Sequence, residues 1–314
     1  MNDELKIYAA PLQGFTEAPW RNAHSAVFGG VDAYYTPFVR LEGGKVRNKD
    51  ARDVQADNNK VDSLIPQIIA GEPDEMHRLV EYLHGMGYRR VDLNMGCPFP
   101  LIANRKKGSG ILPYPDRVKA LLEVMGEYTD IDFSVKMRLG WESADEWKAL
   151  LPMLNDAPLC EVTLHPRIGR QQYKGTVDRE QFSAFCTECT RPLVYNGDLT
   201  TVEDIERLKE EFPMLRGVML GRGLLATPSL AVDYRTCVPM AQQELFGKVY
   251  DMHRLMREHY ERSIEGGDAQ LLAKLKTMWE YLLPDMEKKS RKAIVKARNL
   301  QEYEEKVYLA LHRW

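Results

Sequence analysis

Three side chains that can carry out chemistry, Cys97, Lys136 and His165, stand where short apolar runs of this 314-residue chain end. If these runs are parallel strands of one barrel, their carboxyl ends meet at one mouth, where the active sites of such barrels lie. A thiol there can act as a nucleophile or an acid, and a lysine can hold negative charge on a cofactor ring. Each residue alone also has a structural interpretation, because many buried cysteines and histidines only pack and most lysines are solvated. The three together indicate one reactive pocket.

Two glycine turns follow the last two apolar runs, Asn-Gly-Asp at 196–198 and Gly-Arg-Gly at 221–223. In β/α barrels the loops after strands seven and eight often bind phosphate through backbone N–H groups, and Arg222 would supply a matching charge. The alternative is that both turns only end their strands, but their place in the barrel favours a phosphate site. A third turn, Pro-Leu-Gln-Gly at 11–14, allows the backbone to approach a flat ligand closely.

Two further motifs carry no function here. Residues 221–226 match the G-x-G-x-x-A dinucleotide fingerprint, but a helical tail follows in place of the required second strand, so we reject a Rossmann site. Cys186 and Cys189 form a single C-x-x-C pair without a second pair or a nearby histidine, so we expect no metal site.

The elements that must position these residues alternate along the first 225 residues. Nearly continuous apolar runs, typical of strands covered on both faces, lie at 6–10, 33–38, 64–70, 90–95, 133–137, 161–165, 193–195 and 217–220. Helical spacing of apolar residues marks 73–86, 115–127 and 201–212, whereas the polar segment 43–59 indicates a loop. Eight strand–helix units predict a (β/α)8 TIM barrel, an α/β fold.

The strands stop after Val232, and three helices are predicted at 242–263, 269–286 and 290–314. We therefore expect two domains: a catalytic barrel at 1–236 and an all-α helical bundle at 237–314.

Composition narrows the class of protein. With 44% hydrophobic and 28% charged residues, the chain is neither disordered nor membrane-spanning, and its acidic start does not resemble a signal peptide. The odd, sparse set of five cysteines suits a reducing compartment. We expect a cytoplasmic, monomeric protein with no membrane or metal partner.

The charge is unevenly distributed. From Arg235 to the C-terminus there are 15 basic and 12 acidic residues, a net of +3, against −6 for the remainder. A basic tail suggests contact with a polyanion, although a solvated helical face explains the charge equally well.

The motifs together resemble the tRNA-dihydrouridine synthase family. The matching pieces run in the family's order across the whole barrel: Ala-Pro-Leu-Gln-Gly at 10–14, Gln67, Asp-Leu-Asn-Met-Gly-Cys-Pro at 92–98, Val-Lys-Met-Arg-Leu-Gly-Trp at 135–141, His165-x-Arg167 and the two glycine turns. The pieces around Cys97 and Lys136 are the most specific, because the phosphate turns are shared by many flavin barrels.

The resemblance implies reduction of uridine to 5,6-dihydrouridine in tRNA, with FMN as the bound cofactor and NADPH as the electron donor. It implies hydride transfer from flavin N5 to uracil C6 and protonation of C5 by Cys97, while Asn94 helps to position the uracil. The residues implied to surround the flavin are Pro11, Leu12, Gln67, Lys136, His165, Asn196, Gly197, Asp198, Gly221 and Arg222.

The same resemblance favours RNA contacts by basic residues of the mouth and the tail. Lys288, Lys292 and Lys296 are spaced four apart and share one helical face. The remaining basic candidates are Arg167, Arg170 and Lys274, and Tyr173 stands where related sequences can carry a tyrosine at the base pocket. The chain departs from the family at Pro166 and in the loop 99–107, so the substrate contacts of that loop are open.

Three alternatives remain at this stage. A flavin barrel could reduce a free pyrimidine or another small molecule, although such an enzyme needs no basic tail. The same chemistry could act on ribosomal RNA. A non-catalytic RNA-binding protein could retain the barrel, but the joint presence of Cys97, Lys136 and His165 argues against it.

Overall fold

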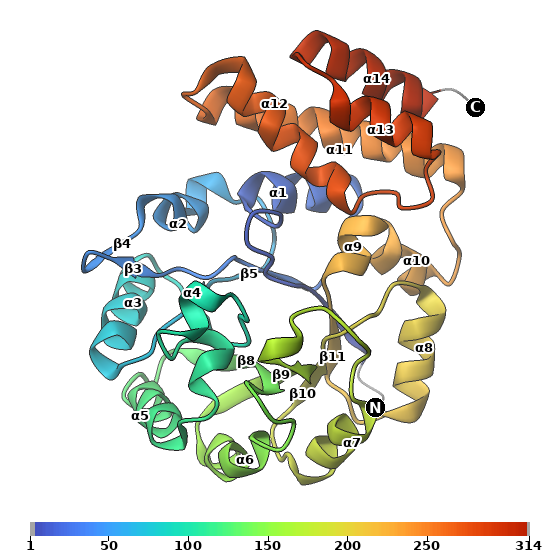
Figure 1. Cartoon of the computed structure of the whole chain (residues 1–314). Coiled ribbons are helices and arrows are strands. Elements are labelled where there is room, and N and C mark those ends of the chain that lie inside the picture. The colour runs from blue at the N-terminus through green and yellow to red at the C-terminus, as the bar shows by residue number, and fades with distance from the viewer. Residues whose placement is uncertain (1–3, 313–314) are drawn as a thin grey trace.

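The strands of the computed structural model, which describes residues 4–312, form one parallel sheet in the order β5-β2-β1-β11-β10-β9-β8-β7-β6. Its members are β1 (Lys6–Ala9), β2 (Ala33–Tyr35), β5 (Leu64–Ile65), β6 (Gln67–Ile68), β7 (Arg90–Met95), β8 (Asp132–Gly140), β9 (Leu159–Ile168), β10 (Leu193–Tyr195) and β11 (Gly217–Leu220). β5 and β6 are two halves of one strand, so the sheet closes into the predicted eight-stranded barrel (Figure 1).

Pro66 divides that strand because proline has no backbone N–H for the ladder. Pairing continues on both sides of it. The N–H of Thr36 donates to Ile65 O (3.0 Å), and the N–H of Asp92 donates to Pro66 O (3.0 Å). The break is therefore local, and the closure of the barrel does not depend on the missing donor.

Helices cover the outside of the barrel. The long ones are α1 (Ala18–Val27), α3 (Pro73–Gly85), α5 (Pro115–Gly126), α6 (Trp147–Asp156), α7 (Arg179–Glu188) and α8 (Val202–Glu211), and the short ones are α4 (Pro100–Ala103), α9 (Arg222–Ala226), α10 (Leu230–Thr236) and the 3-10 turns η2 (Gly108–Ile111) and η3 (Gly169–Gln171). Thr201 caps α8 by accepting from the N–H of Asp204 (3.1 Å), as its sequence pattern predicts.

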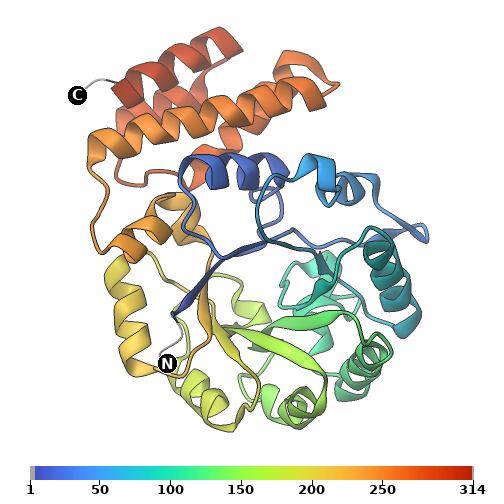
Figure 2. The ribbon, with the colours of Figure 1, turned by 180° about the vertical axis from the view of Figure 1, so that it is seen from behind.

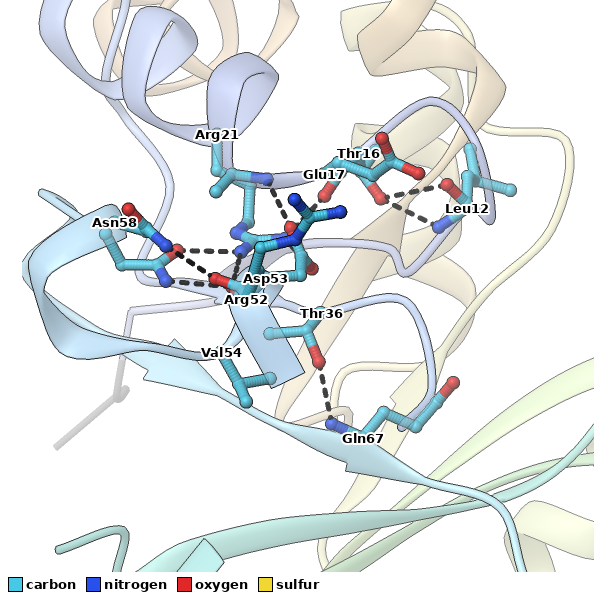
Figure 3. A network of polar contacts seen from close by, with 12 residues as sticks. Leu12, Thr16, Glu17, Arg21, Thr36, Arg52, Asp53, Val54, Asn58 and Gln67 are labelled. Atoms are coloured by element: carbon cyan, nitrogen blue, oxygen red, sulfur yellow. Dashed lines mark hydrogen bonds and ion pairs between the residues drawn. The ribbon is translucent and has the colours of Figure 1, made fainter. Parts of the chain in front are cut away.

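The second strand–helix unit is partly different from the prediction. Residues 43–59, expected as a loop, contain part of a hairpin of β3 (Leu41–Glu42) and β4 (Lys45–Val46), the short helix α2 (Asn48–Asp53) and the turn η1 (Ala56–Asn58). Tertiary contacts stabilise this polar segment. The buried Arg21 donates to Asp53 Oδ2 (3.0 Å) and to Asn59 Oδ1 (2.7 Å). Figure 3 shows this network beside the loop after β1, where Thr16 Oγ1 accepts from the N–H of Leu12 (2.8 Å).

Polar side chains point into the barrel at successive levels along its axis. Side chains of a strand alternate between two faces, so Ser134, Lys136 and Arg138 share one face of β8. The register places Asn94 beside Lys136 and Arg138 beside His165. Deeper in the barrel, Glu161 accepts from the hydroxyl groups of Tyr8 and Tyr35. The strands thus present a stack of hydrogen-bonding groups that leads up to the mouth.

Four helices, where three were predicted, follow the barrel: α11 (Gln242–Ser263), α12 (Gly267–Thr277, continued by η4, Met278–Glu280), α13 (Lys288–Lys296) and α14 (Leu300–His312). The expected single helix 290–314 divides because Asn299 starts a new one. Asn299 Oδ1 accepts from the N–H of Glu302 (2.8 Å), and Glu302 Oε2 accepts from the N–H of Arg298 (2.8 Å). The last two residues of that prediction lie outside the described range.

The predicted helix 269–286 also ends early. Arg291 donates to the carbonyl groups of Trp279, Leu282 and Leu283, and an arginine in this place satisfies carbonyls that a longer helix would have bonded.

The four helices gather over α1 on one side of the barrel (Figure 1), and α11 runs along α1 in the view from behind (Figure 2). Lys274 Nζ lies 3.3 Å from Glu17 Oε2, and the rings of Phe15 and Tyr281 meet edge to face at 5.1 Å. These contacts bring the segment after α12 to the barrel mouth. Within residues 4–312, no helix combines the length and the hydrophobicity needed to span a bilayer.

Candidate active site

A cavity of about 630 Å³ opens at the carboxyl ends of the strands. Its walls include Cys97 after β7, Lys136 on β8 and His165 on β9, so the three reactive side chains identified in the sequence share one pocket. Glu280, Tyr281 and Pro284 of the helical region complete its rim. A hollow of this size with a few convergent polar groups is the usual form of a small-molecule site.

Lys136 is the main charged group of the cavity floor. Its ammonium donates to Asn196 Oδ1 at 2.7 Å, and the Asn196 amide in turn donates to Met219 O (2.7 Å). Burial, assisted by the charge of Arg138, lowers the pKa of Lys136 to about 8. An ammonium has three donors, and within the described chain Asn196 is the one hydrogen-bond acceptor of Lys136, so two donors remain for a ligand.

A chain of hydrogen bonds runs from the barrel interior to Cys97. Asp92 accepts from Ser134 Oγ and from Gln67 Nε2, both at 2.7 Å. Because an ionised carboxylate only accepts, Gln67 must turn its NH2 to Asp92 and its oxygen to Asn94 Nδ2 (2.7 Å). Asn94 Oδ1 then accepts from the backbone N–H of Cys97 at 2.8 Å. The buried Asp92 therefore sets the orientation of both amides.

The Cys97 thiol lies at the cavity wall on a firmly held backbone. Cys97 O accepts from both the N–H (3.0 Å) and the hydroxyl (2.9 Å) of Ser109. A Cβ on Gly108, whose φ is +57°, would lie 2.6 Å from Cys97 O, so this close approach requires glycine. Burial raises the pKa of Cys97, and the charges of Arg138 and Lys136 only partly oppose that shift. The thiol thus keeps its proton at neutral pH.

His165 has a fixed protonation pattern. Its Nε2 lies 3.1 Å from Arg167 Nη1, and because a guanidinium only donates, Nε2 must accept and the proton must be on Nδ1. Burial and the charge of Arg138 lower the pKa of His165 well below its usual value. Arg167 is held by Asp198, with contacts of 3.0 and 2.5 Å. His165 is therefore a neutral donor.

The two glycine turns converge on the same wall. Arg222 Nη2 donates to Asp198 Oδ1 at 2.9 Å, and its guanidinium lies 4.7 Å from the centre of the Tyr173 ring. A Cβ on Gly223 would lie 2.1 Å from Leu199 O, so the turns at 196–198 and 221–223 pack directly together. This geometry places the Arg222 guanidinium, held by Asp198 and Tyr173, beside two glycine loops.

Most of the predicted site residues line the cavity: Pro11, Leu12, Asn94, Cys97, Lys136, His165, Tyr173, Asn196, Gly197, Asp198, Gly221 and Arg222. Gln67 lies behind them, fully buried. Arg167 is also buried and holds His165. Arg170 lies outside the cavity, paired with Glu142 at 2.6 Å, and Lys274 joins the helical region to the barrel. Lys288, Lys292 and Lys296 are exposed on α13, away from the cavity.

Sequence reasoning missed four participants. Arg138 lines the cavity and donates to Gly96 O (3.1 Å) and Gln172 O (2.7 Å). Asp92 orients the amides. Both could have been found from period-two alternation, because each lies two residues before or after a predicted site residue on the same strand. No local sequence pattern indicates that Glu280 and Tyr281 line the cavity, because their position depends on how the helical region packs against the barrel.

A closed β/α barrel with ionisable side chains around one cavity at its carboxyl end defines a TIM-barrel enzyme. Solved structures share the fold: a variant of NCR from Zymomonas mobilis (TM-score 0.51, 12% identity, 75% of this chain and 88% of that one) and morphinone reductase (0.51, 10%, 75% and 86%).

The chain belongs to the dihydrouridine synthase (Dus) family, a family of oxidoreductases whose model matches residues 8–311. It is 27% identical to tRNA-dihydrouridine synthase B of Pasteurella multocida over 233 residues, which cover 72% of this chain and 67% of the relative. It is 28% identical to tRNA-dihydrouridine(16) synthase of Pseudomonas syringae over 256 residues, 77% and 80% of the two chains.

Proposed function

We propose that this protein reduces specific uridines of tRNA to 5,6-dihydrouridine in the cytoplasm, with FMN as its bound cofactor and NADPH as the electron donor. The observation that carries the proposal is the convergence of the Cys97 thiol, the Lys136 ammonium and the neutral His165 on one cavity in a chain of the Dus family. The names of its relatives support tRNA as the substrate.

The cavity residues fit FMN. The two unused donors of Lys136 suit the electron-rich N1–C2 edge of a flavin, and His165 offers an Nδ1–H donor. Arg222 and the paired glycine turns suit the phosphate. Next to the turn at 221–223, the turn at 11–14 adds backbone and the apolar side chain of Leu12, as a flat ring requires; a Cβ on Gly221 would lie 3.8 Å from Leu12 Cδ1.

When bound, FMN would supply a hydride to C6 of the uracil, with NADPH as the source of the electrons. The chain supplies the second hydrogen. Cys97 Sγ–H gives its proton to C5, where negative charge develops, and the thiolate regains a proton from water. A thiol that ionised before this step would be useless as an acid, and the raised pKa of Cys97 prevents that.

Asn94 holds the acid over the base. Its oxygen fixes the backbone of Cys97, and one N–H of its amide is occupied by Gln67. The other N–H is free to donate to a carbonyl group of the uracil. A target base must be extruded from folded RNA to reach this depth, which agrees with a site that opens at the barrel mouth.

RNA contact is proposed for the exposed face of α13. Lys288, Lys292 and Lys296 form no ion pair with a described residue, although acidic residues are common on the neighbouring helices. Such free cations release counterions when they meet phosphates, so binding weakens as salt rises. Replacing all three by alanine should reduce the slope of log affinity against log salt by about two to three, at about 0.7–0.9 per contact.

Mass spectrometry of RNA from cells without this protein tests the proposal. Dihydrouridine should disappear from defined tRNA positions and return when the intact gene is restored. Loss from ribosomal RNA alone would identify that RNA as the substrate. Unchanged dihydrouridine in all RNA, with turnover of free pyrimidines by the purified protein, would favour a small-molecule reductase and refute the proposal.

A further inference from the structure

The segment after Cys97 carries apolar side chains that the fold leaves uncovered. α4 buries Ile102 and Ala103 against the barrel, yet Phe99 is 56% exposed and Leu101 67% exposed. Pro98 lines the cavity and Phe99 does not. An uncovered aromatic ring therefore stands directly outside the entrance, two residues from the thiol.

This segment is held rigidly. Lys107 forms an ion pair with Glu75, and Ser109 ties the backbone at Cys97. Gly110 packs so closely on Ala103 that a Cβ would lie 2.2 Å from its carbonyl oxygen. The exposed ring of Phe99 is consequently presented at a fixed place beside the entrance.

The segment that carries Phe99 is cationic in sequence. Residues 97–115 contain Arg105, Lys106 and Lys107 and no aspartate or glutamate. Lys106 Nζ lies 4.3 Å above the centre of the Tyr114 ring, which is itself 39% exposed. Aromatic faces next to basic side chains are the chemistry with which proteins bind unpaired nucleotides, because bases stack on the rings while cations meet the phosphates.

We propose that Phe99, supported by Leu101 and the cations at 105–106, is a stacking platform for the unpaired nucleotide next to the target uridine. When a uridine leaves the stack to enter the cavity, its neighbour loses a stacking partner, which costs a few kcal/mol. A ring fixed at the entrance replaces that partner. The inference rests on the proposed function, since it assumes an RNA substrate.

The test uses the flavin-loaded protein and unmodified tRNA from cells lacking it. Loss of one stacked base is worth about 1–3 kcal/mol, so Phe99→Ala should weaken tRNA binding about 5- to 150-fold. The slope of affinity against salt should stay unchanged, because stacking releases no counterions. Phe99→Leu, which keeps apolar bulk without a π face, should bind tRNA as weakly as Phe99→Ala. Phe99→Trp should bind tRNA as tightly as the wild type.

Met214→Ala is the matched control. Met214 is 71% exposed in the loop before β11, at the opposite end of the barrel, and its replacement should leave tRNA affinity unchanged. All variants should retain full flavin absorbance, which shows that the site is intact. Arg105→Ala should instead reduce the salt slope by about 0.7–0.9.

Equal tRNA affinity of wild type, Phe99→Ala and Phe99→Leu would overturn the platform while leaving the reductase intact. Binding of Phe99-intact protein to anionic phosphatidylglycerol vesicles, lost in Phe99→Ala while tRNA affinity is unchanged, would also overturn it in favour of a membrane contact. If the wild type itself bound no tRNA, the proposed function would be refuted, and with it the stacking platform that depends on it.

Discussion

Lys136 allows a prediction with a worked magnitude. Its pKa of about 8 lies below the usual 10.5 because the folded barrel desolvates the ammonium and Arg138 adds positive charge. The charged form of Lys136 is therefore poorly stabilised in the flavin-free protein. A bound flavin that accepts hydrogen bonds from the free N–H donors of Lys136 should raise the pKa towards the ordinary value. Cofactor binding should then be coupled to uptake of a proton at Lys136.

The size of the effect follows from that pKa. About 90% of the lysine is protonated at pH 7 and about 10% at pH 9. FMN affinity should thus fall about tenfold across this range, a change of about 1.4 kcal/mol. Lys136→Met removes a charge-assisted hydrogen bond worth about 1.5–3 kcal/mol. It should bind FMN about 10- to 150-fold more weakly at pH 7, with no further loss up to pH 9.

The assay is quenching of FMN fluorescence by the flavin-free protein between pH 7 and 9, a range in which the cofactor's phosphate is already ionised. Lys119→Met, which removes a lysine that is 64% exposed on α5, controls for the change in net charge and should match the wild type at every pH. A wild-type affinity that does not change with pH, or a Lys136→Met variant that binds as tightly as the wild type at pH 7, would refute the assigned role.

Three further predictions concern neighbouring groups. Cys97→Ala should keep its flavin and its tRNA affinity but lower turnover about 10²- to 10⁴-fold, measured under single-turnover conditions; equal turnover would exclude the thiol as the acid. Arg167→Met should release His165 from its single tautomer, so ¹⁵N NMR should show a new Nε2–H population where the wild type shows Nδ1–H alone; an unchanged spectrum would contradict the inferred lock. Burial raises the pKa of Asp92 to about 6 from 3.8, so the folded state favours its neutral form and the penalty is absent below pH 3.8 and complete above about pH 6. The wild type should therefore lose about 3 kcal/mol of unfolding free energy as the pH rises from 3.8 to about 6, whereas Asp92→Asn should show no such loss in denaturation experiments. Identical pH profiles for variant and wild type would count against this prediction.

The barrel and its strand ends were predictable because both depend on local pattern. Apolar runs at the right spacing identified all eight strands, and the rule that strand ends meet at one mouth located Cys97, Lys136 and His165. The polar segment around α2 was not predictable, because a buried arginine from α1 stabilises it. The division of the last helix was predictable in principle, since an asparagine followed three residues later by a glutamate, as at Asn299 and Glu302, is a recognisable sign of a helix start.

Roles were harder to predict than positions. Arg167 was a candidate for RNA contact as a basic residue of the barrel mouth, but its side chain is 2% exposed and bonds His165 and Asp198. Lys274 was assigned to RNA from its charge, yet it pairs with Glu17 across the junction of barrel and helices. A sequence shows which charges exist, whereas the partner of each charge depends on segments far away in the chain.

The proposed role of Cys97 as the acid, which the family resemblance implies, agrees with the state of the other groups that the cavity brings together. His165 accepts at Nε2 from a permanent cation, so that atom carries no proton, and its low pKa leaves the ring neutral. Asp92 is fully buried and already accepts two hydrogen bonds. Lys136 is placed to hold negative charge and, if it gave up its proton, would lose the charge that this role needs. Cys97 combines a retained proton, a place on the cavity wall and a backbone held by neighbours on both sides, and these properties support the proposal that its thiol is the acid.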